Sequence, residues 1–101
     1  MKDDNKKTDE HILVCLSAAP SNQKIIDTAA KMANALQTRF TALYVQTGTK
    51  AEAADKEKLE EHIRYAEKLG AEIVMTHGEN IPVQIAEYAR LSNVTKIVIG
   101  Q

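Results

Sequence analysis

Four short apolar stretches alternate with three segments of helical periodicity along the 101-residue chain. The stretches cover residues 11–16, 40–45, 71–76 and 95–99. Residues 12–16 form a continuous apolar run, which is typical of a strand that is covered on both faces. Strands separated by helices are joined by right-handed crossovers into a parallel sheet. The alternation therefore predicts an α/β domain built around a parallel sheet.

Capping and turn residues set the limits of the expected helices. Ser21 or Asn22 can begin a helix that runs to about Thr38, and Gly70 suits the left-handed residue after a second helix that ends near Leu69. A third helix has Asn80 as N-cap and Pro82 in its first turn, and Asn93 can end it. The residues expected to face the core are Ile25, Ala29, Met32, Ala33, Leu36, Leu59, Ile63, Ala66, Leu69, Ile85 and Ala89.

Composition narrows the class of protein. The net charge is -1 and four residues are aromatic, so neither a basic nucleic-acid surface nor a stacking platform is expected. No apolar run reaches the roughly 20 residues of a membrane span, and no direct membrane contact is expected. A lone Cys15 fits a reducing compartment, which favours a cytoplasmic location. Residues 1–10 are polar and predict a flexible leader or linker before a domain over 11–101.

Catalytic and metal-binding patterns are absent from the sequence. There is no glycine fingerprint after the first stretch, no P-loop, and no Cys-x-x-Cys or His-x-x-x-His pair. A phosphoacceptor receiver would need acidic residues where Ser17 and Thr76 or His77 stand. Cys15 is expected to be a buried small hydrophobe, and His62 a solvated residue on a charged helix. We therefore expect no catalytic residue, no metal and no required cofactor.

The turn after the first predicted strand is the best candidate for a ligand site. In open α/β sheets ligands bind outside the carboxyl ends of strands, where crossovers turn to opposite sides. With strand order 3-2-1-4, the turn 17–21 would face Gly100, with Tyr44 beside it and Gly78 further along. Its small residues allow close approach, and the N-terminus of the next helix can meet an anion. A simple chain reversal is the alternative.

Several stretches together resemble a universal stress protein domain, and more narrowly the one inside Kdp-type potassium-sensor histidine kinases (the KdpD family). The matching stretches are 12–17, 40–45, 78–90 and 93–101. The resemblance implies a three-layer α/β/α fold with strand order 3-2-1-4 and the usual fifth strand missing, that is, a truncated domain. It also implies a parent protein-histidine kinase, whose other domains would be the partners.

The resemblance also implies a nucleotide ligand. ATP-binding members carry Asp at the end of strand one, where this chain has Ser17, and a glycine-rich loop, of which Gly100 matches the first glycine. Some kinase domains resemble cyclic di-AMP receptors with Ser-x-Ser, twenty residues, then Phe-Thr-Ala-x-Tyr. Here Ser17 and Phe40 keep that spacing, and Ala19 replaces the second Ser. The candidate ligand-binding residues are Ser17, Ala18, Ala19, Phe40, Thr41, Ala42, Tyr44, Gly78 and Gly100.

Three functions are compatible with these observations. The first is a non-catalytic regulatory domain of a two-component sensor kinase that controls potassium transport and the osmotic response, with cyclic di-AMP as ligand. The second is a stand-alone universal stress protein that binds ATP. The third is a ligand-free module that dimerises through the apolar edge strand 97–99.

Overall fold

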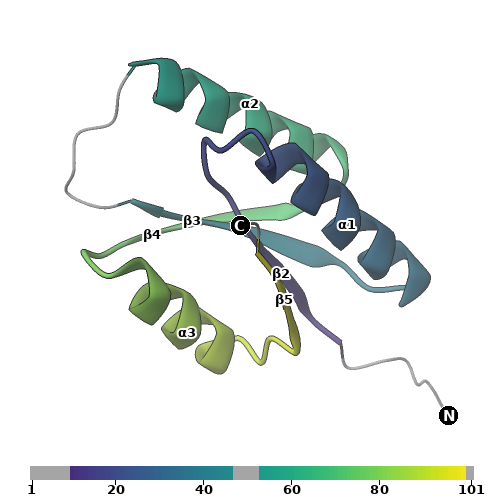
Figure 1. Cartoon of the computed structure of the whole chain (residues 1–101). Helices are drawn as coiled ribbons and strands as arrows, with labels where there is room; N and C mark the ends of the chain where they lie inside the picture. Colours follow the sequence, from purple (N-terminus) through teal and green to yellow (C-terminus); the bar gives the residue numbers. More distant parts are fainter. Residues whose placement is uncertain (1–9, 47–52, 100–101) are drawn as a thin grey trace, which may run out of the picture.

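The computed structural model describes residues 10–46 and 53–99, which form four strands and three helices (Figure 1). Along the chain these are β2 (Ile12–Cys15), α1 (Asn22–Ala35), β3 (Phe40–Gln46), α2 (Ala53–Lys68), β4 (Glu72–His77), α3 (Ile81–Leu91) and β5 (Lys96–Val98). The alternation predicted from the sequence is confirmed. None of the helices in this part of the chain is long and apolar enough to cross a membrane.

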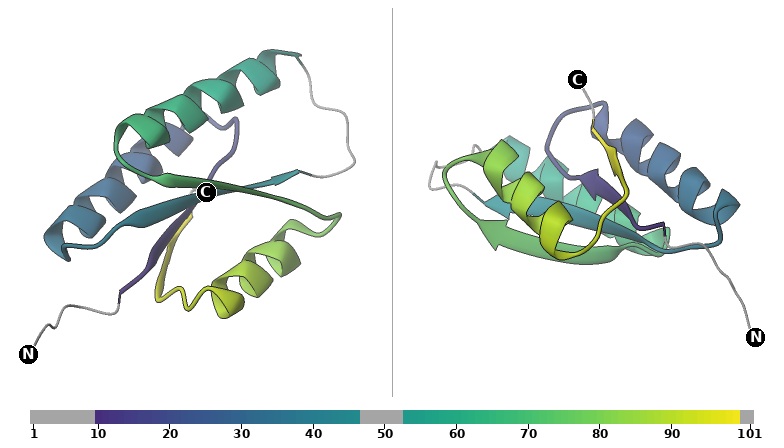
Figure 2. Two further views of the ribbon diagram at one scale, coloured as in Figure 1. Left: turned by 180° about the vertical axis from the view of Figure 1, so that it is seen from behind. Right: turned by 90° about the horizontal axis from the view of Figure 1, so that it is seen from below.

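The strands form one parallel sheet in the order β4-β3-β2-β5. This is the expected order 3-2-1-4 in terms of successive strands. Helices α1 and α2 cover one face of the sheet and α3 covers the other, so the domain has three layers (Figures 1 and 2). The crossover direction therefore changes between β2 and β5, and a ligand crevice is expected at the carboxyl ends of these strands.

Each face of the sheet has its own hydrophobic core. On the side of α1 and α2 the core contains fully buried Ile12, Val14 and Ile26. On the side of α3 it contains Leu13 and Leu43, with Ile85 packed against them. Alternate residues of β2 thus enter opposite cores, which explains why its sequence is apolar without interruption.

Local signals at the helix ends agree with the structure. The Asn80 side chain accepts a hydrogen bond from the Val83 N–H at 3.2 Å, as an N-cap residue should, and Pro82 lies in the first turn of α3. Gly70 has a φ of 99° and Asn93 a φ of 58°, both in the left-handed region. Side chains that favour these conformations therefore mark where α2 and α3 end.

Two expectations about side chains on the helices were wrong, those for Leu69 and His62. On α1, Ile25 packs against the core as expected although it is only partly buried, and the neighbouring Ile26 is fully buried. Leu69 is 38 % exposed, since it follows the last residue of α2 and the chain turns away there. His62 is 7 % exposed, because its ring lies against the β2–α1 loop.

Glu10 and His11, at the start of the domain, make polar contacts near the amino ends of the strands. The Thr38 hydroxyl donates to the Glu10 carbonyl at 2.9 Å, and Lys96 Nζ lies 3.8 Å from the Glu10 carboxylate. His11 contributes two further contacts, from Nδ1 to the Ser92 carbonyl and from Nε2 to the Thr41 hydroxyl, each 3.0 Å long. Glu10, which the sequence placed in the leader, is thus bonded to the folded domain. Residues 1–9 of that leader lie outside the described residues.

Candidate functional site

The loop between β2 and α1 is held in place by its own hydrogen bonds. The Leu16 N–H donates to the Leu43 carbonyl at 2.8 Å, which continues the sheet pairing past the end of β2. The Ser17 hydroxyl oxygen accepts from the Ala19 N–H at 3.2 Å. The Asn22 side-chain amide donates to the Cys15 carbonyl at 2.9 Å. These bonds fix the loop from both ends, so its small residues present a defined surface.

A histidine from α2 also holds this loop. His62 Nδ1 lies 2.8 Å from the Ser17 carbonyl oxygen. Because a carbonyl can only accept, Nδ1 must carry a proton. Sequence reasoning missed this residue, although a signal was present. His62 is three residues after Leu59 and four before Ala66, both expected on the inner face, and this spacing places the imidazole on that face.

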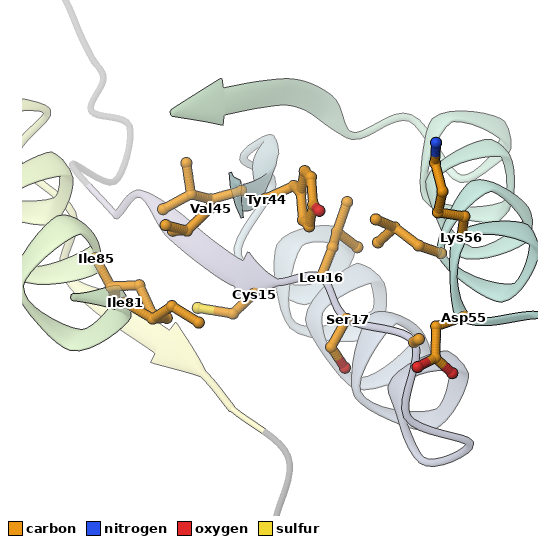
Figure 3. A pocket seen from close by; sticks show the side chains of 12 residues that line it. Cys15, Leu16, Ser17, Tyr44, Val45, Asp55, Lys56, Ile81 and Ile85 are labelled. Atoms are coloured by element: carbon orange, nitrogen blue, oxygen red, sulfur yellow. The ribbon is translucent and has the colours of Figure 1, made fainter. Parts of the chain in front are cut away.

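A cavity of about 230 Å³ opens between the end of β2, α2 and the start of α3. We call it the first cavity (Figure 3). Cys15, Ile81 and Ile85 lie together on one side of it, whereas Asp55 and Lys56 at the start of α2 lie on the other. Its lining is mostly apolar with charged groups at one side, an arrangement that suits a ring system carrying a polar substituent.

A second cavity of about 230 Å³ adjoins the first at the end of β2. Five lining residues are common to both: Cys15, Leu16, Ser17, Ile81 and Ile85. The second cavity extends to Ala19, Ser21 and Asn22 at the N-terminus of α1, and to Ile99 after β5. It therefore lies at the change of crossover direction between β2 and β5.

The predicted site residues do not all meet at these cavities. Ser17 lines both, Ala18 and Tyr44 line the first, and Ala19 lines the second. The other residues of the β3 motif, 40–42, are buried within the sheet, and the Thr41 hydroxyl contacts His11. Gly78 follows β4 and donates its N–H to the Gln46 carbonyl at 3.1 Å. Gly100 lies outside the described residues.

Among the described residues, the thiol of Cys15 beside the cavities and the phenol of Tyr65 on α2 have shifted pKa values. Burial raises the pKa of the Cys15 thiol, so this side chain is uncharged at neutral pH and is a poor nucleophile. The hydrogen bond from Tyr65 to Asp27 raises the pKa of the Tyr65 phenol and links α2 to α1. Among residues 10–46 and 53–99 there is no cluster of three side chains that could hold a metal ion.

Comparison with known proteins places the chain by sequence and by fold. No protein-family model matches it. It is 48% identical over 94 residues to the sensor protein KdpD of Clostridium acetobutylicum, which covers 93% of the chain and 10% of that protein. It is 28% identical over 96 residues to the sensor protein KdpD of Escherichia coli, with 93% and 11% covered. The chain thus spans about a tenth of the length of these curated relatives.

Solved structures with the same fold include universal stress proteins. One from Burkholderia pseudomallei has a TM-score of 0.70 at 17% identity and covers 91% of the chain and 81% of its own length. A universal stress protein in complex with cAMP has a TM-score of 0.63 at 20% identity, with 87% and 69% covered. That of Archaeoglobus fulgidus in complex with dAMP has a TM-score of 0.62 at 22% identity, with 90% and 80% covered.

Fold and sequence together define the class of this chain. The parallel sheet, its strand order and the structural neighbours are those of the universal stress protein fold. Within that fold, its sequence relatives are sensor proteins, and the chain is a universal-stress-protein-like domain of the KdpD type.

Proposed function

We propose that this chain is a regulatory domain of a sensor histidine kinase that controls potassium transport and the osmotic response. It binds a ligand and transmits its occupancy to the other domains of the parent protein, with no reaction of its own. Support comes from the sensor proteins KdpD, to which its sequence is similar and of whose length it spans about a tenth. The protonated Cys15 thiol beside both cavities also suits binding better than nucleophilic chemistry.

The ligand that this site fits is an adenine nucleotide, with cyclic di-AMP as the first candidate. The observation that carries this proposal is the pair of adjoining apolar cavities at the carboxyl end of β2, the first beside β3 and the second beside β5. Each is smaller than the roughly 300 Å³ at which ligand pockets begin, whereas the two together fall within the usual range. A dinucleotide has two apolar bases, and one could enter each cavity.

The phosphates of such a ligand would lie near the N-terminus of α1. Within the described residues, the Ser21 side chain makes no capping bond and the first turn of α1 carries no acidic residue. A helix N-terminus in this state favours an anion. Lys56 beside the first cavity offers a positive charge. Structural neighbours in complex with cAMP and dAMP show that this fold can hold adenine nucleotides.

Isothermal titration calorimetry of the chain with cyclic di-AMP, cAMP and ATP tests the proposal. We expect cyclic di-AMP to bind most tightly. Replacing Ser17, which lines both cavities, by Gln should obstruct them and weaken binding at least about tenfold, whereas Thr28→Gln on the exposed face of α1 is the matched control. Ala19→Ser should strengthen binding by restoring the hydroxyl of the Ser-x-Ser pattern.

Two results would contradict the proposal. Absence of heat and of thermal stabilisation with all three nucleotides would remove the nucleotide ligand and favour a role in docking between domains. Tighter binding of ATP than of cyclic di-AMP would favour the stand-alone, ATP-binding type of universal stress protein.

A further inference from the structure

The side chain of Asn22 carries a buried hydrogen-bond acceptor that nothing in the described part of the chain satisfies. Asn22 is the first residue of α1, is 2 % exposed and lines the second cavity. Its Nδ2 donates to the Cys15 carbonyl at 2.9 Å. Its Oδ1 is shielded from solvent and has no hydrogen-bond partner among the described residues. Buried polar groups are nearly always paired, so this oxygen requires an explanation.

The orientation of this amide is fixed by its surroundings. If the amide were flipped, Oδ1 would face the Cys15 carbonyl oxygen, and two acceptors would be opposed. The donor must therefore point to Cys15 and the acceptor away from it. Asn22 lines the second cavity, so a group that enters this cavity and displaces the side chains around Oδ1 can supply the missing donor.

We propose that Asn22 determines the base specificity of this site by accepting a hydrogen bond from the 6-amino group of adenine. This inference rests on the proposed function, in which the ligand is an adenine nucleotide. The free sugar hydroxyl differs between cAMP, which keeps the 2′-OH, and dAMP, which keeps the 3′-OH. The amino group of the base is the donor that both share with cyclic di-AMP.

The rest of the second cavity suits a purine. Ile25, Ile81 and Ile99 line it with apolar surface against which the faces of a ring can pack. A base seated there with its amino group on Oδ1 would remove the cost of the unpaired acceptor. A 6-oxo purine would instead place an oxygen against Oδ1, and sites built for a donor reject analogues that lack it. Discrimination between adenine and hypoxanthine is the expected consequence.

The test compares cyclic di-AMP with cyclic di-inosine monophosphate, in which both amino groups are replaced by oxygens. We expect the wild-type chain to prefer cyclic di-AMP by about tenfold or more. In Asn22→Leu, which has a side chain of similar size without polar atoms, affinity for cyclic di-AMP should fall to that for the inosine analogue. Asn34→Leu, at an exposed position near the other end of α1, is the matched control.

Asn22→Leu also removes the donor to the Cys15 carbonyl, so this variant could fail to fold. A second variant is therefore needed. Asn22→Asp keeps an acceptor oxygen, so the preference for adenine should persist. Its negative charge should weaken the binding of both ligands. Equal binding of both ligands by the wild type, or an equal loss for both in Asn22→Leu, would overturn the inference while the proposed function stands. If neither ligand binds the wild type, both the inference and the proposed nucleotide ligand are contradicted.

Discussion

A single side chain, that of His62, connects helix α2 to the loop that lines both cavities. Its Nδ1 donates to the Ser17 carbonyl from a position that is 7 % exposed. The bond joins residues that are 45 positions apart in the chain. The shape of the candidate site therefore depends on how α2 packs, although only its first turns line the first cavity.

Replacing His62 by Leu should lower the free energy of unfolding by about 1–2 kcal/mol, because the buried imidazole no longer donates to the Ser17 carbonyl. Urea denaturation followed by circular dichroism measures this loss, with Arg64→Leu at an exposed position of α2 as control. Binding of cyclic di-AMP should weaken as well. Equal stability of the His62 and Arg64 variants would show that the contact contributes nothing.

The Cys15 thiol should make the stability of the fold depend on pH. Burial raises the pKa of its thiol in the folded state, so the folded state holds this proton more tightly than the unfolded state does. The stability from this difference is complete below the ordinary thiol pKa of 9.0 and is lost as the pH rises through the folded value. We therefore expect stability to decline as the pH rises above 9.0.

The contribution of Cys15 is isolated by the Cys15→Ala variant. Tyr65 also has a raised pKa and titrates in the same direction, so wild type and variant must be compared over the same pH range. The decline in unfolding free energy should be smaller in Cys15→Ala. Identical declines in urea titrations of the two proteins would assign the whole effect to other groups.

At the scale of elements, the ends of the helices could be predicted from local residues, whereas the way the helices pack on the sheet could not. The N-cap Asn80 and the left-handed Gly70 act within one turn, so their neighbours in sequence suffice to recognise them. Ile25 and Ile26 are both apolar, and only the way α1 rests on the sheet decides which is buried. Sequence patterning cannot supply that orientation.

The candidate site shows the same division between what is local and what is not. The loop after β2 could be predicted, because Ser17 and Ala19 follow a recognisable strand. The sequence did not show that Phe40 lies away from the cavities. It is four residues before Tyr44 along β3, which is about 13 Å in an extended strand. Asn22 was expected only as an alternative to Ser21 as the cap of α1, and only the folded chain shows that its side-chain oxygen lacks a partner among the described residues.

The cap of α3 provides a test at the same scale. Asn80→Ala should lower the free energy of unfolding by about 1 kcal/mol, because the Val83 N–H loses its acceptor at the end of the helix. Asn80→Ser keeps a capping oxygen and should retain most of the stability. Both are measured by urea denaturation. If the Ala and Ser variants are equally stable, the cap does not act through this bond.

At the scale of the whole molecule, the two edges of the sheet differ. Strand β4 is six residues long and ends in polar side chains, whereas β5 has three residues and pairs with β2 on one side only within the described part. Ile97 is 42 % exposed and Ile99 is 60 % exposed beside this open edge. Unpaired backbone groups next to exposed apolar side chains favour pairing with another chain.

We therefore expect the isolated chain to self-associate through β5, in a concentration-dependent way that light scattering after size-exclusion chromatography can follow. Ile97→Lys places a charge on the edge strand and should shift the chain to monomer. Leu91→Lys on α3 removes an even more exposed apolar side chain, 71 % exposed, without altering the edge. If association were caused by apolar exposure in general, both variants would dissociate. A chain that stays monomeric at high concentration would show that the short length of β5 is enough to prevent pairing.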